Sequence, residues 1–307
     1  MRYSEFKTQK EFKKFLREND LTVAEYFEKY ESKNDLFTNE KLNFKYSGKY
    51  PTKSDIEKYF LYDFRDKRHM AKWLDDQYKD AQREYILKKL NYRAKEKEWI
   101  HAPSQVECRS LREIPALNVI DYCNDEKLWK EFGLNRKYQY IDFKPRFETL
   151  NNTILAIDTR EQKPLKIENS KIIKLAFGDY CFIEEPYFCN VFIERKSIQD
   201  LWGTMSQGYD RFQREIERAA SQNGYIIVVV DYLFSKAQSY NYNKKYSKAS
   251  SEFIFHRIRE LMQKYENVQF VFSGGRKQSV ELIKKIGLLG EKAKTIDLQY
   301  ALDMKKI

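Results

Sequence analysis

The pattern of apolar and polar residues divides the chain into two parts. Up to about residue 135, apolar residues recur every three or four positions between charged ones, which is typical of amphipathic helices. From Thr153 onward, short runs of β-branched and aromatic residues alternate with helical patterns, which indicates an α/β domain with a mixed sheet. Pro145 and Asn151-Asn152 interrupt both patterns between Lys144 and Asn152. We therefore predict a mainly α-helical domain over residues 1–147 and an α/β domain over residues 152–307.

Helix-start signals support the helical assignment of the first part. Capping boxes, in which a hydroxyl and a glutamate three residues later satisfy early helix amides, occur at Thr8–Glu11, Thr22–Glu25 and Ser54–Glu57. The longest predicted helix runs from about Asp66 to Trp99 and ends before Pro103. Its basic residues either contact phosphates or form a solvated face, which is the commoner case. These residues are Arg83, Lys88, Lys89, Arg93 and Lys95.

The second part shows six strand patterns and three helix patterns. The run Ile226–Val230 has no polar alternation, so we expect a central strand that is buried on both faces. The predicted strands are Thr153–Ile157, Ile172–Phe177, Tyr180–Glu184, Asn190–Glu194, Tyr225–Val230 and Val268–Phe272. The predicted helices are Ile198–Ala220, Ser250–Tyr265 and Lys277–Ile286.

Composition narrows the class of protein. With 42% hydrophobic and 34% charged residues, the chain is expected to fold, and no apolar run approaches the roughly 20 residues that span a bilayer. The polar N-terminus lacks the apolar core of a signal peptide, so we expect a cytoplasmic protein, or one in the host cytoplasm if the source is viral. The four cysteines form no Cys-x-x-Cys pair, which predicts reduced thiols and argues against structural zinc. The formal charge of +11 favours an anionic partner, most commonly nucleic acid.

Candidate chemistry lies around Gly178–Lys196, which has the pattern of a β-hairpin. Antiparallel pairing of its two predicted strands would place Asp179, at the start of one, beside Glu194, near the end of the other. Alternation sends Glu194 and Lys196 to one face and Arg195 to the other. Clustered carboxylates repel unless a cation neutralises them, and oxygen ligands suit Mg²⁺ or Mn²⁺. Taken alone, this short pattern is as readily a charged surface hairpin.

Further motifs, which occur in a fixed order along the chain, favour a metal-binding site over a charged surface hairpin. Asp158-Thr159-Arg160-Glu161 precedes Gly178-Asp179-Tyr180, and Glu194-Arg195-Lys196 is followed three residues later by Asp200 and then by Arg211-Phe212. This set closely resembles the nuclease domain of the XPF/Hef family, a branch of the PD-(D/E)XK nucleases, over about residues 153–286. The family signature is Gly-Asp, a variable stretch, Glu-Arg-Lys, three residues and Asp. The resemblance implies a restriction-endonuclease-like mixed sheet flanked by helices.

The resemblance also implies roles for individual residues. Asp179 and Glu194 correspond to the principal metal ligands, and Lys196 to the catalytic lysine. Arg195 is expected either to contact phosphate or to form a structural ion pair, and Asp200 either to orient Lys196 or to cap a helix. The expected catalytic set is Asp158, Glu161, Asp179, Glu194, Lys196 and Asp200. The expected metal ligands are Asp158, Asp179, Glu194 and the carbonyl of Arg195, and the expected DNA contacts are Arg160, Arg195, Arg211, Lys244 and Lys245.

The implied activity is Mg²⁺-dependent hydrolysis of DNA, with Mn²⁺ able to substitute, at branched, flap or junction structures. A sequence-specific restriction or homing-type endonuclease and an inactive DNA-binding module are the alternatives. We expect no nucleotide cofactor, because no Gly-x-x-x-x-Gly-Lys-Ser/Thr loop is present, and no tandem helix-hairpin-helix module. The resemblance also suggests a homodimer through the nuclease domain, along the predicted helices Ser250–Tyr265 and Lys277–Ile286. The segment Ser235–Lys248, rich in lysine and tyrosine, is either a second DNA contact or a polar loop.

Overall fold

The computed structural model describes residues 6–21, 29, 90–111, 125–140, 154–184, 187–240 and 249–307. The chain forms two compact units. The first contains Met1–Glu98 with Arg112–Ile114, and the second contains Trp99–Leu111 with Pro115–Ile307. Residues 99–111 therefore belong to the same unit as the α/β part, whereas the boundary predicted at Lys144–Asn152 lies outside the described residues.

In the first unit, helix α1 (Gln9–Glu18) begins as predicted. The Thr8 hydroxyl accepts a hydrogen bond from the Glu11 amide, and Glu11 in turn accepts from the amide of Lys7. Phe6 packs against Phe12 and Phe15, so an aromatic cluster fixes one face of the helix. Residues 90–96 are also helical. The capping boxes at Thr22 and Ser54 and most of the long predicted helix lie outside the described residues.

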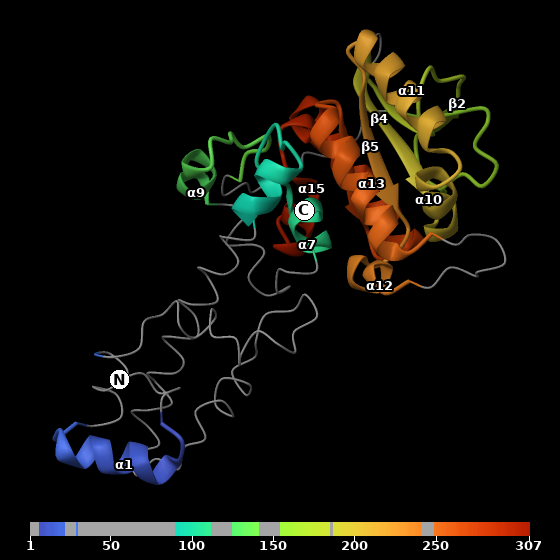
Figure 1. The fold of residues 1–307 in the computed structure, drawn as a ribbon. Helices are drawn as coiled ribbons and strands as arrows, with labels where there is room; N and C mark the ends of the chain where they lie inside the picture. Colours follow the sequence, from blue (N-terminus) through green and yellow to red (C-terminus); the bar gives the residue numbers. More distant parts are fainter. Residues whose placement is uncertain are drawn as a thin grey trace. The chain divides into compact units, whose positions relative to one another are not determined.

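The second unit is built on a mixed six-stranded sheet with the order β2-β1-β3-β4-β5-β6 (Figure 1). Strand β1 pairs parallel to β2 and antiparallel to β3, β3 pairs antiparallel to β4, and β4, β5 and β6 are mutually parallel. The strands are β1 (Ile154–Ile157), β2 (Ser170–Ile172), β3 (Tyr180–Glu184), β4 (Tyr187–Lys196), β5 (Tyr225–Val230) and β6 (Val268–Phe272). The predicted mixed sheet flanked by helices is confirmed.

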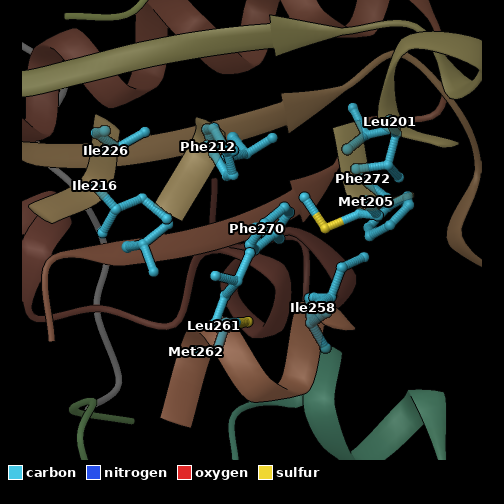
Figure 2. Close-up of a cluster of buried hydrophobic side chains, with 14 of the residues drawn as sticks. Leu201, Met205, Phe212, Ile216, Ile226, Ile258, Leu261, Met262, Phe270 and Phe272 are labelled. Atoms are coloured by element: carbon cyan, nitrogen blue, oxygen red, sulfur yellow. The ribbon is translucent and has the colours of Figure 1, made fainter. Parts of the chain in front are cut away.

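Helices cover both faces of this sheet, so strands β1 and β3 to β6 contribute alternate side chains to two separate cores, whereas β2 is exposed. On one face, Phe212 and Ile216 of α11 (Tyr209–Ser221) pack with Ile226 and Phe270 of the strands (Figure 2). Helices α10 (Ile198–Met205), α12 (Phe234–Gln238) and α13 (Ser251–Lys264) complete that core. The opposite core is formed by α14 (Arg276–Leu289), the 3-10 helix η2 (Gly290–Lys294) and α15 (Leu298–Asp303). Strand β5 is buried along its whole length, as predicted.

Two details of the predicted elements are wrong. The structure has β2 at Ser170–Ile172, so the strand predicted at Ile172–Phe177 overlaps it by one residue. The predicted helix Ile198–Ala220 is two helices, α10 and α11, separated at Ser206-Gln207-Gly208. The break arises because the chain must turn between two helices that pack on the same sheet face, and a count of apolar spacing does not register it.

A segment N-terminal to the sheet packs onto α13. Helix α7 (Gln105–Ser110) begins with a capping box formed by Ser104 and Glu107. The amide of Gln263 on α13 donates to Glu107 at 2.7 Å, and its oxygen accepts from the Ile100 amide at 3.0 Å. Helix α9 (Glu126–Glu131) lies further along this segment, and the Lys137 ammonium donates to the carbonyls of Met262 and Tyr265 at the C-terminal end of α13. Residues 99–111 therefore cover the side of α13 that carries Gln263.

The structure also bears on membrane insertion. Among the residues described, no helix is both long and apolar enough to cross a bilayer.

Candidate active site

Three strand ends meet at one edge of the sheet. Because β1 and β4 both run antiparallel to β3, the ends of β1 and β4 lie beside the start of β3. Asp158 directly follows β1, Asp179 directly precedes β3, and Glu194 lies two residues before the end of β4. The Asp158 amide donates to the Asp179 carbonyl, and the Asp179 amide donates to the Ile193 carbonyl, both at 2.8 Å. The strand pairing predicted for the hairpin is confirmed, and it carries the three acidic positions to one edge.

Gly178 makes the turn into β3 possible. Its φ is +60°, a conformation that L side chains rarely adopt. A Cβ at this position would also lie 2.8 Å from the carbonyl oxygen of Ile193, which is backbone and has little freedom to move away. The glycine before Asp179 is therefore required by the close approach of the turn to β4.

Asp179 and Glu194 form a pair of like charges. The Arg195 amide donates to the Asp179 carboxylate at 2.8 Å, which fixes Asp179 against β4. Burial, followed by the negative charge of Glu194, raises the pKa of Asp179 to about 7. The fold thus holds the two carboxylates close together without fully neutralising their negative charge.

Lys196 lies on the same face as this pair. Its ammonium donates to Glu194 at 2.8 Å and lies 5.4 Å from the ring centroid of Phe212 on α11. The lysine is only 8% exposed. Since both its ion-pair partner and the aromatic ring restrict it, the ammonium is held at a defined place beside the carboxylates.

Arg195 points to the opposite face, as the alternation predicts. Its guanidinium donates to Asp231 at 2.6 Å and to Glu161 at 3.2 Å, and all three side chains are nearly buried. Of the two roles considered for Arg195, this arrangement favours the structural ion pair. Asp231 was not among the predicted site residues. Its sequence signal is an acidic residue directly after the apolar strand β5.

Asp158 is engaged by its own neighbours. Arg160 donates to its carboxylate through Nε at 2.6 Å, and the Leu175 amide donates at 2.6 Å. Burial alone would raise the pKa of Asp158, but these hydrogen bonds outweigh it and hold the pKa below its usual value. The structure therefore brings Asp158 to the same edge but directs its carboxylate toward Arg160 and not toward a joint cluster with Asp179.

The remaining predicted residues differ in how they are placed. Asp200 forms a capping box with Ser197 at the start of α10, which favours the capping role. Arg211 is exposed on α11. Lys244 and Lys245 lie outside the described residues, with most of the segment Ser235–Lys248.

A further carboxylate beside the site was not predicted. Glu215, on α11, is partly buried, and burial and the charge of Glu194 raise its pKa. Lys196 and the Gly178 amide lie close enough to act against that rise. In the sequence, Glu215 is one of several charged residues on an amphipathic helix, so nothing in the local pattern separates it from surface charges.

Asp179 and Glu194 fit a hard divalent cation. Mg²⁺ commonly takes one or two protein carboxylates and keeps several waters. Two adjacent carboxylates with only one ammonium beside them provide such a donor set, and the backbone carbonyl of Arg195 lies between Glu194 and Lys196. Within the part of the chain that the structure describes, no group of three or more acidic, histidine or cysteine side chains is arranged to bind a metal. A divalent cation at this site would therefore be held by the two carboxylates, by a backbone carbonyl and by water.

These features define an α/β domain with two carboxylates and a lysine at one edge of a mixed sheet. Residues 157–286 match the family model of the ERCC4 domain, which is consistent with the XPF-type nuclease domain expected in the C-terminal half of the chain. Among solved structures, the chain is similar to XPF from Aeropyrum pernix, with 14% sequence identity and a TM-score of 0.34. That alignment covers 46% of this chain and 68% of the other. No curated protein gives a significant match.

Proposed function

We propose that the protein is a metal-dependent DNA endonuclease that hydrolyses phosphodiester bonds, selectively at branched, flap or junction DNA. The observation that carries this proposal is the half-buried pair Asp179 and Glu194 with the buried Lys196 beside it. The match of residues 157–286 to the ERCC4 domain supports the nuclease class. The preference for branched DNA rests on the family resemblance.

The chain's own residues have separate tasks in this proposal. Asp179 and Glu194 would hold Mg²⁺, or Mn²⁺ in its place, together with the Arg195 carbonyl. When bound, such an ion polarises a phosphodiester and lowers the pKa of a coordinated water. The Lys196 ammonium, fixed by Glu194 and Phe212, would stabilise negative charge at the phosphorus or orient the attacking water.

DNA binding requires basic groups that solvent can reach. Arg160 is paired with Asp158 but 64% exposed, and Arg211 is exposed on α11, so both remain candidates for phosphate contact. We assign Lys244 and Lys245 the same role from the sequence alone. The predicted helical domain over residues 1–147 is the proposed source of further DNA affinity.

A homodimer through the nuclease domain also remains a proposal. The side of α13 that carries Arg259 and Gln263 is covered by residues 99–111, because Arg259 donates to Ser110 at 2.8 Å and Gln263 donates to Glu107. This contact leaves α14 as the helix to test for a dimer.

The function is tested with labelled flap, fork, junction, single-stranded and linear DNA, each with Mg²⁺, Mn²⁺ or chelator. Wild type should cleave branched substrates only with metal, and Asp179→Ala or Glu194→Ala should lower cleavage by about 1,000-fold or more because the metal ligands are lost. Asp303→Asn, which alters an ion pair with Arg109 elsewhere in the same unit, is the control.

The substrate panel also separates the alternatives. Equal cleavage of branched and linear DNA of one sequence, with strong dependence on that sequence, would favour the restriction or homing-type enzyme. DNA binding without cleavage under any metal condition would favour an inactive module. Cleavage by Asp179→Ala at the wild-type rate would exclude this centre.

A further inference from the structure

Asp231 lies at the carboxyl end of β5, directly beside the end of β4. Its amide donates to the Lys196 carbonyl at 2.8 Å, which continues the parallel pairing of the two strands by one residue. Its carboxylate accepts from the Arg195 guanidinium at 2.6 Å. One residue therefore holds both Arg195 and Lys196, the first through its side chain and the second through its backbone.

The ion pair is nearly buried, and further groups of the chain hold both of its ends. The second oxygen of Asp231 accepts from the hydroxyl of Ser279 on α14, which is fully buried. The other end of the Arg195 guanidinium donates to Glu161 and to the Lys163 carbonyl, each at 3.2 Å. Arg195 is 10% and Asp231 9% exposed. Since these partners occupy both terminal nitrogens, the guanidinium is not free to contact DNA.

The position of this network relates it to the catalytic face. Side chains alternate across a strand, so a fixed Arg195 on one face sets the directions of Glu194 and Lys196 on the other. The Arg195 amide also holds Asp179 at 2.8 Å. A rotation or shift of this one residue would therefore displace the Asp179 hydrogen bond and both neighbouring side chains.

We propose that Asp231 is a positioning residue of the nuclease centre, which anchors Arg195 behind the sheet so that Asp179, Glu194 and Lys196 converge in front of it. This inference rests on the proposed nuclease function. In this proposal Arg195 has a structural role in the site and does not contact DNA. It also gives Ser279, on a distant part of the chain, a role in orienting Asp231.

Asp231→Asn keeps the shape of the side chain and removes its charge. We expect kcat for cleavage to fall about 10- to 100-fold and the affinity for Mn²⁺, measured by calorimetry without DNA, to weaken by a comparable factor. DNA affinity, measured with Ca²⁺ in place of Mg²⁺, should stay within about twofold of wild type. Asp231→Glu, which restores the carboxylate, should recover part of the loss. Ser279→Ala should show a smaller effect in the same direction.

Asp303→Asn is the matched control, because Asp303 also pairs with an arginine, Arg109, but at the contact of α7 with α15. It should lower stability without changing kcat or Mn²⁺ affinity. If Asp231→Asn fails to fold, Asp231→Glu and Ser279→Ala carry the test in the same assays.

Wild-type kcat and Mn²⁺ affinity in Asp231→Asn would overturn the proposal. So would tighter DNA binding by this variant that disappears in the double variant with Arg195→Met, because Arg195 would then be a DNA contact. Asp179→Ala, assayed in parallel, distinguishes a failure of the proposed nuclease function from a failure of the positioning role of Asp231. If it still cleaves DNA, the proposed function fails, whereas an inactive Asp179→Ala beside a fully active Asp231→Asn overturns only the positioning role.

Discussion

Two groups of buried and half-buried polar side chains in the same unit differ in how their charges are matched. At the contact between α7 and α13, Gln263 bonds Glu107 and the backbone of residues 100 and 101, and Arg259 pairs with Glu252 at 2.9 Å. At the sheet edge, Asp179 and Glu194 are held beside one another, with hydrogen bonds from the Arg195 amide to Asp179 and from the Lys196 ammonium to Glu194. The first group is matched donor to acceptor, whereas the second keeps an excess of negative charge.

This difference separates the network at the α7–α13 contact from the site that we propose to be catalytic. Burying a polar group is tolerated when a partner of the right kind faces it, and the α7–α13 network satisfies that condition. Holding two like charges together at a half-buried position lowers stability, and groups perturbed in this way cluster at functional sites. Both regions contain acidic and basic residues, so their composition does not distinguish them. The distinguishing feature of the Asp179–Glu194 site is its excess of negative charge.

The largest expected effect is the loss of cleavage when the buried Lys196 is replaced. Lys196→Met should reduce cleavage about 100-fold or more, because no ammonium remains beside the reacting phosphate. The same variant should bind Mn²⁺ more tightly, because a positive charge has been removed from beside Glu194. Rates are compared in single-turnover assays and affinities by calorimetry.

Lys137→Met is the matched change in the other network, where the ammonium donates to the carbonyls of Met262 and Tyr265. It should lower the melting temperature and leave the cleavage rate of folded protein unchanged. A loss of cleavage in Lys137→Met equal to that in Lys196→Met would contradict the separation.

The second effect tests how strongly matched hydrogen bonds stabilise the fold. Gln263→Leu leaves the Glu107 carboxylate and the Ile100 and His101 amides without this partner, so we expect unfolding free energy to fall by about 2–4 kcal/mol. Urea denaturation measures it. The exposed Gln278 on α14 provides the control variant Gln278→Leu, with an expected change within about 0.5 kcal/mol. Equal stability of the two variants would show that the α7 contact contributes little.

The smallest effect concerns the charge pair in metal-free protein. Because the pKa of Asp179 is raised to about 7 in the fold, the folded state binds more protons than the unfolded state between about pH 4 and pH 7. Unfolding free energy should therefore fall as the pH rises through that interval. Asp179→Asn should remove this contribution and be more stable than wild type at pH 8, by on the order of 1 kcal/mol.

Denaturation at several pH values in chelator measures this slope, and Mg²⁺ should restore stability to wild type alone. Asp210→Asn, at an exposed carboxylate on α11, should keep the wild-type slope. A wild-type slope in Asp179→Asn would mean that Asp179 is not the group that titrates.

The local sequence pattern predicted side-chain directions, strand pairing and a buried strand of this protein. Alternation along Glu194-Arg195-Lys196 placed two side chains on one face and one on the other, and the pairing of Asp179 with Glu194 followed from the hairpin. The uninterrupted apolar run of β5 identified a strand buried on both sides. These features depend on spacing within one or two neighbouring elements, which the sequence states directly.

Tertiary structure decided what lies opposite each of these groups. Asp231 and Ser279 reach Arg195 from β5 and α14, and Glu215 reaches the charge pair from α11, each far along the chain from the hairpin. The direction of Asp158 toward Arg160 and the cover of α13 by residues 99–111 likewise depend on how elements pack. Sequence thus determined the carboxylates and the lysine and the sheet edge that presents them. Their electrostatic balance depends on distances between groups remote in sequence, so only the folded arrangement could determine it.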